Sequence, residues 1–303
     1  MKLRSISLSQ LGKYSACGKQ WQLGKIIRAP RVQSMSQVFG TAVHAGLETF
    51  NNDHYIAKAV PVDRAAIIAE FKQELSAVTE QALLEEHTKI KGQKNSRVAL
   101  RKLDFPEFKV FVMDELTQVG ISLLDQYITR TDHGTEALSI EDRRTEDLYG
   151  LTFRYIIDLL DVYQGKVRLR DYKTKNRADP KLARLQLTGY AWALREYQDI
   201  QVEIVEQLNF VRTASNPRLE ILHYDIADLQ ADFVIFEREV DTFIRGVRSD
   251  IFPRNHAHYC DSCEVKEVCF DPVREAEITD AADEEEDNNE LELGHAAPGF
   301  TGP

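Results

Sequence analysis

Two apolar segments joined by a tight turn constrain the fold of this chain more than any other feature of its sequence. Residues 151–162 and 167–172 have the apolar pattern of strands, and Gly165 lies in the short turn between them. Strands with so short a connection pair antiparallel. Asp158 and Asp171 lie late in these two segments, so both carboxylates are expected on one side of the sheet.

The rest of the chain alternates between helical and strand-like patterns. Helices are expected over 7–17, 38–50, 65–84, 110–128, 180–194 and 227–247, and further strands over 137–140, 202–212 and 219–224. The polar segment 89–97 is expected to be a mobile connection. This order predicts an α/β fold, in which residues 1–270 form one domain with a helical insertion over about 60–130 and a core over 137–225.

The charge of the chain is concentrated at its C-terminal end. The 303 residues have a net charge of −11, and residues 271–303 contain eleven acids and one base. That segment therefore holds −10 of the total, and residues 1–270 are nearly neutral at −1. We expect a disordered acidic tail from Asp271 onward, with a spacer or solubility role. The overall acidity gives no argument against a nucleic-acid partner.

Asp158, Asp171 and Lys173 have the chemistry that phosphodiester hydrolysis requires. Two carboxylates with open coordination positions suit a hard divalent cation such as Mg²⁺ or Mn²⁺. Lys173 follows Asp171 by two residues and so points to the same face of the strand. Its ammonium group can orient a water that the metal activates. Taken alone, this short pattern also fits an ion pair at the exposed end of a strand.

Four short elements in a fixed order resemble the RecB-like branch of the PD-(D/E)XK nuclease superfamily. The segment 40–44 is similar to the family's Gly-x-x-x-His element, and 186–190 is similar to its Gln-x-x-x-Tyr element. Between them, 155–160 and 171–174 (Asp-Tyr-Lys-Thr) are similar to the central motif. The resemblance covers most of residues 5–270. One departure is Tyr155, which stands where the family often has glycine.

The resemblance implies a restriction-endonuclease-like core, with a central mixed sheet flanked by helices. The residues that it assigns to the metal are His44, Asp158, Asp171 and the backbone carbonyl of Tyr172, and Lys173 becomes the catalytic lysine. Gln186 and Tyr190 lie four residues apart on one helical face, where they would hold the lysine or contact DNA. Without this context, His44 would be a hydrogen-bonded structural histidine, and Gln186 and Tyr190 would be partly buried polar residues.

The four cysteines are Cys17, near the start of the chain, and the group Cys260, Cys263 and Cys269. Within the same family, the CRISPR adaptation exonucleases and the AddB subunits have this arrangement around a 4Fe–4S cluster. The resemblance therefore implies a cluster that joins the N- and C-terminal segments and couples its own binding to folding. A structural Zn²⁺ site and four unligated buried thiols are the alternatives.

Two runs of basic residues are candidate contacts to the DNA backbone, although such runs are commonly only solvated faces. The first comprises Lys89, Lys91, Lys94, Arg97, Arg101 and Lys102, and the second comprises Lys166, Arg168, Arg170, Lys173, Lys175 and Arg177. Tyr14 and Trp21 are candidates for base stacking, with packing near the cysteines as the alternative.

The sequence thus predicts a metal-dependent DNA exonuclease, acting on single-stranded ends in recombination, repair or replication. The strand preference comes from the resemblance alone. No phosphate-binding Gly-x-x-x-x-Gly-Lys-Ser/Thr loop is present, so unwinding would need a partner helicase. The sequence has no run of 18 apolar residues and no secretory signal, so no membrane span is expected. Four cysteines are too few for a disulfide scaffold, which favours a cytoplasmic, reducing setting. The alternative function is a non-catalytic DNA-binding or assembly module. A serine or cysteine hydrolase is a weaker hypothesis, because the sequence has no Gly-x-Ser-x-Gly elbow.

Overall fold

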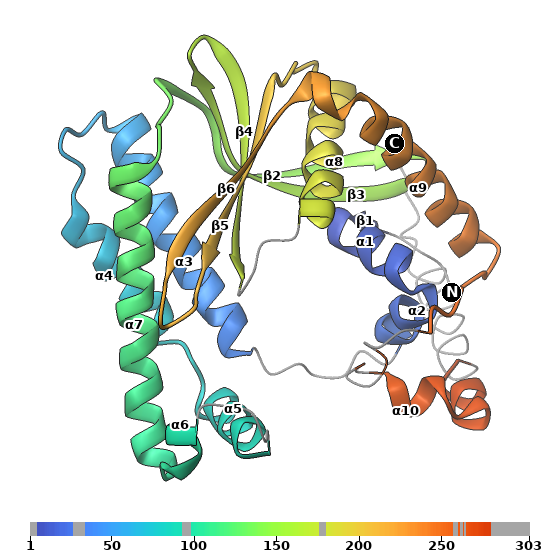
Figure 1. Ribbon diagram of the computed structural model, residues 1–303. Helices are drawn as coiled ribbons and strands as arrows, with labels where there is room; N and C mark the ends of the chain where they lie inside the picture. Colours follow the sequence, from blue (N-terminus) through green and yellow to red (C-terminus); the bar gives the residue numbers. More distant parts are fainter. Residues whose placement is uncertain are drawn as a thin grey trace, which may run out of the picture. The chain divides into compact units, whose positions relative to one another are not determined.

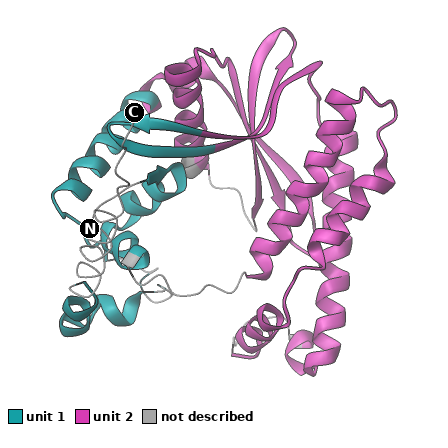
Figure 2. Cartoon of the chain, turned by 180° about the vertical axis from the view of Figure 1, so that it is seen from behind, with its two compact units in different colours: residues 1–30, 145–155, 233–303 teal, residues 31–144, 156–232 magenta. Residues whose placement is uncertain are grey.

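The computed structural model describes residues 5–26, 34–92, 98–175, 180–256, 260, 263 and 265–279. The chain divides into two compact units, each built from segments that are distant in the sequence (Figure 2). Unit 1 comprises Met1–Pro30, Thr145–Tyr155 and Phe233–Pro303, and unit 2 comprises Arg31–Arg144 and Ile156–Asp232. No helix in these described ranges has the length and apolarity needed to cross a bilayer.

The strands form a mixed sheet, which confirms the predicted α/β class. The strands are β1 (Ser5–Ser7), β2 (Glu136–Leu148), β3 (Leu151–Tyr163), β4 (Lys166–Lys175), β5 (Ile204–Val211) and β6 (Arg218–Asp225). Their hydrogen-bonded order is β1-β3-β4-β5-β6, and β2 pairs with β3. The β3–β4 and β5–β6 pairs are antiparallel, whereas β4 and β5 are parallel. Helix α8 (Pro180–Gln198) makes the long crossover that a parallel pair requires.

Helices cover both faces of the sheet in unit 2, as Figure 1 shows. Helix α8 contacts β4 and β5, while α3 (Met35–Asn51) contacts β4 and α7 (Phe105–Arg130) contacts β6. Every residue of β5 is consequently buried. The apolar core of this unit includes Phe39 of α3, Tyr127 of α7 and Phe210 of β5.

The helical segment before the sheet differs from prediction in several places. The region expected as a single helix over 65–84 is two helices, α4 (Arg64–Leu75) and α5 (Glu80–Gly92). The predicted mobile connection over 89–97 is also wrong in its first part, since Lys89 to Gly92 complete α5; residues 93–97 lie outside the described residues. The segment also contains the π-helical turn η1 (Asn52–Ile56) and the short helix α6 (Val98–Lys102).

Unit 1 combines both ends of the chain. Strand β1 pairs in parallel with the start of β3. The helices are α1 (Leu8–Ala16), α2 (Gly18–Ile26), α9 (Gln230–Arg248, after the 3₁₀ turn η2, Ile226–Leu229) and α10 (Lys266–Cys269). Tyr14 and Trp21 are buried and pack edge-on against Phe243, with ring centroids 5.0 and 5.3 Å away. This geometry supports packing rather than base stacking for these two aromatic residues.

The acidic tail begins with ordered structure, contrary to the expectation of disorder from Asp271. Residues 272–279 are helical. The Asp271 carboxylate accepts the backbone N–H groups of Val273 and Arg274, which caps this helix, and Glu275 pairs with Lys19 and Arg254. Residues 280–303 lie outside the described part of the chain.

Candidate active site

Helix α3 brings His44 to the backbone of β4. Gly40, one turn before it, lies directly against this strand: a Cβ atom at Gly40 would lie 2.9 Å from Oγ1 of Thr174. Glycine therefore allows a close approach of helix and strand. As a result, Nε2 of His44 lies 3.1 Å from the backbone carbonyl oxygen of Tyr172.

Asp158 lies where β3 and β4 separate. Their pairing runs from Tyr163 opposite Lys166 to Leu159 opposite Arg170. One residue further, Oδ2 of Asp158 accepts the backbone N–H of Tyr172 at 2.6 Å, in place of a strand partner. The other carboxylate oxygen, Oδ1, lies 4.0 Å from Nδ1 of His44. The side chain is only 9% exposed.

Asp171 and Lys173 lie two residues apart in β4, so both side chains point to the face of the strand that α8 covers. The ammonium of Lys173 donates to Oδ1 of Asp171 at 2.6 Å, and Nε2 of Gln207 donates to Oδ2 at 3.0 Å. From α8, Nε2 of Gln186 approaches Oδ1 at 3.5 Å and also donates to the Tyr190 hydroxyl at 3.1 Å. The sequence-predicted residues of β4 and α8 are therefore brought together around one carboxylate.

The side chain of Tyr172 points to the opposite face of β4 and is buried. Its hydroxyl lies 2.8 Å from that of Tyr127 on α7 and accepts Nδ2 of Asn51, on α3, at 3.3 Å. His44 and Asn51 thus attach one helix to both the backbone and the side chain of Tyr172. This arrangement fixes the direction of the Tyr172 carbonyl group.

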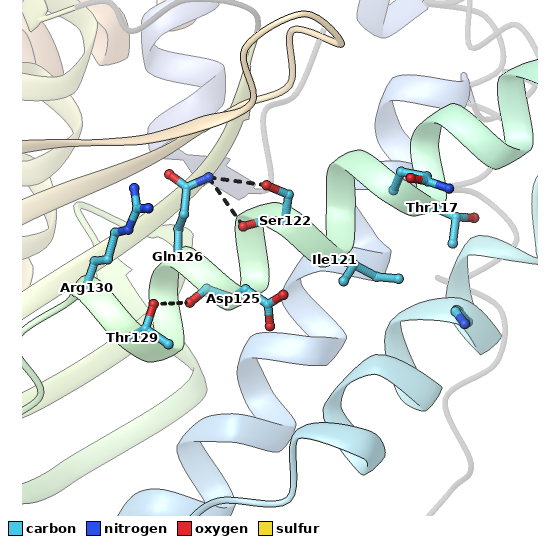
Figure 3. Close-up of a pocket in the computed structure, with 9 residues that line it drawn as sticks. Thr117, Ile121, Ser122, Asp125, Gln126, Thr129 and Arg130 are labelled. Atoms are coloured by element: carbon cyan, nitrogen blue, oxygen red, sulfur yellow. Dashed lines mark hydrogen bonds between the residues drawn. The ribbon is translucent and has the colours of Figure 1, made fainter.

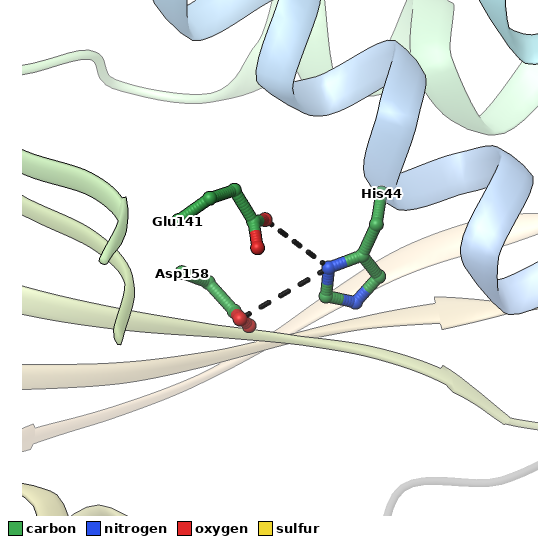
Figure 4. A group of neighbouring side chains, drawn as sticks. All are labelled: His44, Glu141 and Asp158. Atoms are coloured by element: carbon green, nitrogen blue, oxygen red, sulfur yellow. Dashed lines mark hydrogen bonds and ion pairs between the residues drawn. The ribbon is translucent and has the colours of Figure 1, made fainter. Parts of the chain in front are cut away.

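Glu141 is the site residue that sequence reasoning missed. It belongs to β2, and its Oε1 lies 3.3 Å from Nδ1 of His44 (Figure 4). Among the described residues, His44, Glu141 and Asp158 are the one group in which three metal-ligating atoms of acidic, histidine or cysteine side chains lie within 4.8 Å of one another. Asp171 is outside this group, because its carboxylate is turned to Lys173 and Gln207. A run of charged residues, 141–144, made Glu141 resemble a solvated strand surface.

The pKa values of Asp158 and Lys173 depend on burial and on the charges of neighbouring side chains. Burial raises the pKa of Asp158, and the nearby charge of Asp171 raises it further, to about 7. Burial alone would lower the pKa of Lys173, but the charges of Asp171, Tyr190 and Asp158 together raise it above its usual value. Lys173 therefore remains an ammonium ion at neutral pH. It is suited to orient a water and to stabilise negative charge, rather than to accept a proton.

The sequence pattern of the PD-(D/E)XK nuclease superfamily matches residues 5–270. The chain belongs to this superfamily. Among solved structures, it is similar to a candidate exonuclease from Eubacterium rectale at 12% identity, with a TM-score of 0.46 over 86% of this chain and 87% of that one. It is also similar to the protein SSO0001 at 13% identity, with a TM-score of 0.32 over 65% of this chain and 97% of that one. No curated protein matches the sequence.

Membership in the PD-(D/E)XK superfamily implies nuclease activity and DNA as the substrate. Members usually use Mg²⁺ or Mn²⁺. The oxygen and imidazole donors of His44, Glu141 and Asp158 provide a candidate site for such an ion in this nuclease.

Arg168 and Arg170 are not DNA contacts in this PD-(D/E)XK nuclease, and that part of the prediction is wrong. Each is 1% exposed. Arg168 donates to both oxygens of Asp161 at 2.9 and 2.7 Å, and Arg170 donates to Glu206 at 2.8 Å. Alternation along β4 places these arginines on the face opposite Asp171 and Lys173.

Of the other predicted DNA contacts, Lys89 and Lys91 are exposed in the last turn of α5. Lys175 ends β4 and lies two and four residues after Lys173 and Asp171, so it shares their face of the strand. Lys94, Arg97 and Arg177 lie outside the described residues.

All four cysteines lie in unit 1 and are free thiols. The sulfur of Cys17 lies 3.9 Å from the carbonyl oxygen of Pro253, and that of Cys260 lies 3.8 Å from the carbonyl oxygen of Asn255. Cys263 and Cys269 pack against a small core of Leu23, Val265 and Val268. The fold thus brings Cys17 and Cys260 to the same short segment, 253–255.

A surface hollow of about 570 Å³ lies along α7 and includes Lys72 of α4 (Figure 3). Most of its lining residues have polar side chains, and within it Gln126 donates to the backbone carbonyl of Ser122, one turn earlier. None of the sequence-predicted site residues lines this hollow. It is therefore separate from the candidate active site.

Proposed function

We propose that this protein is a metal-dependent DNA exonuclease that hydrolyses phosphodiester bonds at single-stranded ends, in DNA recombination, repair or replication. One observation supports the reaction above all: side chains from α3 and β3 converge on the backbone of Tyr172 in β4, where His44 and Asp158 lie 3.1 and 2.6 Å from its carbonyl and amide groups. The preference for single-stranded ends rests on the likeness of the sequence motifs to the RecB-like branch.

The residues proposed to hold one Mg²⁺ or Mn²⁺ ion are His44, Asp158, Asp171 and the Tyr172 carbonyl. Oxygen ligands with one imidazole fit such a hard cation. When bound, the ion polarises a phosphoryl oxygen and lowers the pKa of a bound water. The protein's own part is to hold the scissile phosphate beside Lys173, whose ammonium stabilises the developing charge. Gln186 and Tyr190 would keep Asp171 and Lys173 in place.

A nuclease assay on end-labelled DNA tests the reaction. We expect the wild type to degrade single-stranded DNA with Mg²⁺ or Mn²⁺, and Asp158→Asn and Lys173→Ala each to lower the rate by at least about 100-fold. Asp142→Asn and Lys72→Ala are matched controls outside the proposed machinery. A closed circular single strand should remain intact if the enzyme requires an end.

Equal rates in all of these variants would exclude this site. A wild type that binds DNA without cleaving it would instead identify a non-catalytic DNA-binding module. Cleavage of the closed circle would assign an endonuclease and overturn only the exonuclease part of the proposal.

For the cysteines, we propose a 4Fe–4S cluster that joins the two ends of the chain. Gly18 supports this, because a Cβ there would lie 2.7 Å from Pro253, so glycine lets segment 253–255 pass beside Cys17. No three of the four sulfurs, all of them described, lie within 4.8 Å of one another. A tetrahedral Zn²⁺ with bonds of about 2.3 Å would need sulfurs about 3.8 Å apart, so this spacing does not fit a structural zinc site.

Anaerobic purification followed by visible spectroscopy and metal analysis tests the cluster. We expect a brown protein with about four iron atoms per chain, and loss of that colour in Cys263→Ser. A colourless protein with one equivalent of zinc would replace the cluster by a structural zinc site. A metal-free protein that folds normally would leave four unligated thiols.

DNA is proposed to approach along two groups of basic residues. Lys175 extends the face of Asp171 and Lys173, and Lys89 and Lys91 supply further positive charge at the end of α5. Lys94, Arg97 and Arg177 are proposed contacts on the sequence alone. Substituting Lys89 and Lys91 by alanine should reduce DNA affinity mainly at low salt, because phosphate contacts act through counterion release. A partner helicase is proposed to supply unwinding.

A further inference from the structure

His44 has an acceptor at each of its ring nitrogens. Nε2 lies 3.1 Å from the Tyr172 carbonyl oxygen, and Nδ1 lies 3.3 Å from Oε1 of Glu141 (Figure 4). A neutral imidazole has one N–H donor and one lone pair. When the ring binds a metal ion, one nitrogen becomes the ligand and the other keeps its hydrogen bond. The two contacts therefore correspond to two different roles for Glu141.

In the first arrangement, Nε2 and the Tyr172 carbonyl bind the same ion, and Nδ1–H donates to Glu141. Neighbouring ligands of an octahedral ion with bonds of about 2.1 Å are about 3.0 Å apart. The observed separation of these two atoms, 3.1 Å, fits that value. In the second arrangement, Nδ1 is the ligand together with Glu141 and Asp158, and Nε2–H donates to Tyr172.

The distances around Nδ1 and a general property of metal-binding histidines favour the first arrangement. Nδ1 lies 4.0 Å from Oδ1 of Asp158, which is longer than neighbouring ligands require, whereas its distance to Glu141 is that of a long hydrogen bond. Metal-binding histidines also ordinarily donate their second N–H to a carboxylate or carbonyl group, which fixes the orientation of the ring. We infer that Glu141 is a positioning residue that holds His44 with Nε2 toward the metal, a role that rests on the proposed metal-dependent function.

The backbone of β2 is shaped to present Glu141. Its φ angle is +46°, a left-handed conformation that is unusual for a residue other than glycine. The alternation of exposed side chains also changes phase there, from Glu136 and Leu138 before it to Arg143 and Thr145 after it. One extra residue in a strand has this effect, and such bulges redirect side chains next to active sites. The strain at Glu141 is therefore accounted for by a role at His44.

Titration of the DNA-free protein with Mn²⁺ by calorimetry tests the inference without relying on activity. We expect Glu141→Ala to weaken Mn²⁺ binding by about 10- to 100-fold, the usual cost of losing the partner of a metal-bound histidine. Glu141→Gln should keep most of the affinity, because its amide oxygen can still accept from Nδ1–H. Asp142→Asn, a neighbour on the same strand that pairs with Arg144, removes the same charge and serves as control.

The outcomes separate the alternatives. If Glu141→Gln loses as much affinity as Glu141→Ala while Asp142→Asn does not, then Glu141 is itself a ligand and the inference is overturned. Unchanged affinity in Glu141→Ala, with an unchanged far-UV circular dichroism spectrum, would also overturn it. If Glu141→Ala does not fold, Glu141→Gln alone decides between the two arrangements. A wild type that binds no Mn²⁺ would contradict the proposed metal-dependent function as well.

Discussion

Gln207 holds the carboxylate of Asp171 in one orientation. It lies on β5 directly opposite Asp171 in the parallel register and is fully buried. Its amide donates to one oxygen of Asp171 at 3.0 Å, while Lys173 holds the other at 2.6 Å. Both oxygens are thereby fixed, which reduces the rotational freedom that metal binding would otherwise have to restrict.

Replacing Gln207 by leucine should separate this positioning from packing. The leucine keeps a side chain of similar size at this buried position but removes the donor to Asp171. We expect the Mn²⁺ concentration for half-maximal cleavage to rise by about 10-fold, as for other partners of metal ligands. Gln118→Leu, at an exposed position of α7, is the control. An unchanged metal requirement with a lower melting temperature would make Gln207 a packing residue only.

The residues that the sequence motifs identified lie close together, whereas Glu141 and Gln207 could not have been found in that way. A short sequence pattern can identify His44, Asp158 and Lys173, because each lies a few residues from a glycine or from the end of a strand. The inferred role of Glu141 depends on the left-handed backbone conformation of β2 at that residue, and that of Gln207 depends on the register of β5 against β4. Both depend on contacts between segments that are distant in the sequence, and no local pattern specifies these.

At the scale of elements, periodicity predicted most helices and strands but not the break between α4 and α5. The Ser76 hydroxyl donates to the backbone carbonyl of Gln73 and ends α4, and Oγ1 of Thr79 accepts the N–H of Ala82 at the start of α5. Such side-chain bonds compete with the helix. Strand β2 is longer than predicted because its charged second half, Glu141–Leu148, conceals the strand pattern.

Close packing of α4 on α7 depends on Gly120. A Cβ atom there would lie 2.0 Å from Cζ of Phe71, whose ring is fully buried. We expect Gly120→Ala to lower the free energy of unfolding by about 1–3 kcal/mol, the usual cost of overpacking. Urea denaturation followed by circular dichroism measures it. Gly92→Ala, where a Cβ would meet nothing within 4 Å, should change stability by less than about 1 kcal/mol. Equal effects at both positions would contradict this packing argument.

The buried ion pairs join β3, β4 and β5 on the face away from Lys173. Asp161 is fully buried and accepts two hydrogen bonds from Arg168. Removing one partner leaves an uncompensated buried charge, so Asp161→Ala should cost about 3–5 kcal/mol of unfolding free energy. The exposed pair Asp241–Arg245 is the control, and Asp241→Ala should cost less than about 1 kcal/mol. If Asp161→Ala lowered the free energy of unfolding as little as Asp241→Ala, the charge of Arg168 would be balanced by other groups and this argument would be wrong.

At the scale of the whole molecule, the net negative charge lies in a different part of the sequence from the candidate active-site residues. The superfamily match ends at residue 270, next to Cys269, and nearly all the net negative charge follows it. Some of that segment is structural, since Glu275 pairs with Lys19 at 2.8 Å. Residues 280–303 contain eight acids and no lysine or arginine, so their removal would change the net charge from −11 to −3.

Truncation after Thr279 tests whether this charge acts on DNA binding. Charges separated by more than about 10 Å are largely screened at 0.1 M salt. If the acidic residues repel DNA only from a distance, they should therefore weaken DNA binding at low salt and have no effect at physiological salt. We expect the truncated protein to cleave saturating DNA at the wild-type rate. In the Asp158→Asn background, its affinity for single-stranded DNA at physiological salt should equal that of the full chain. A gain of about tenfold or more that persists as salt rises would instead mean that the acids occupy the DNA site directly, because screening does not abolish close contacts.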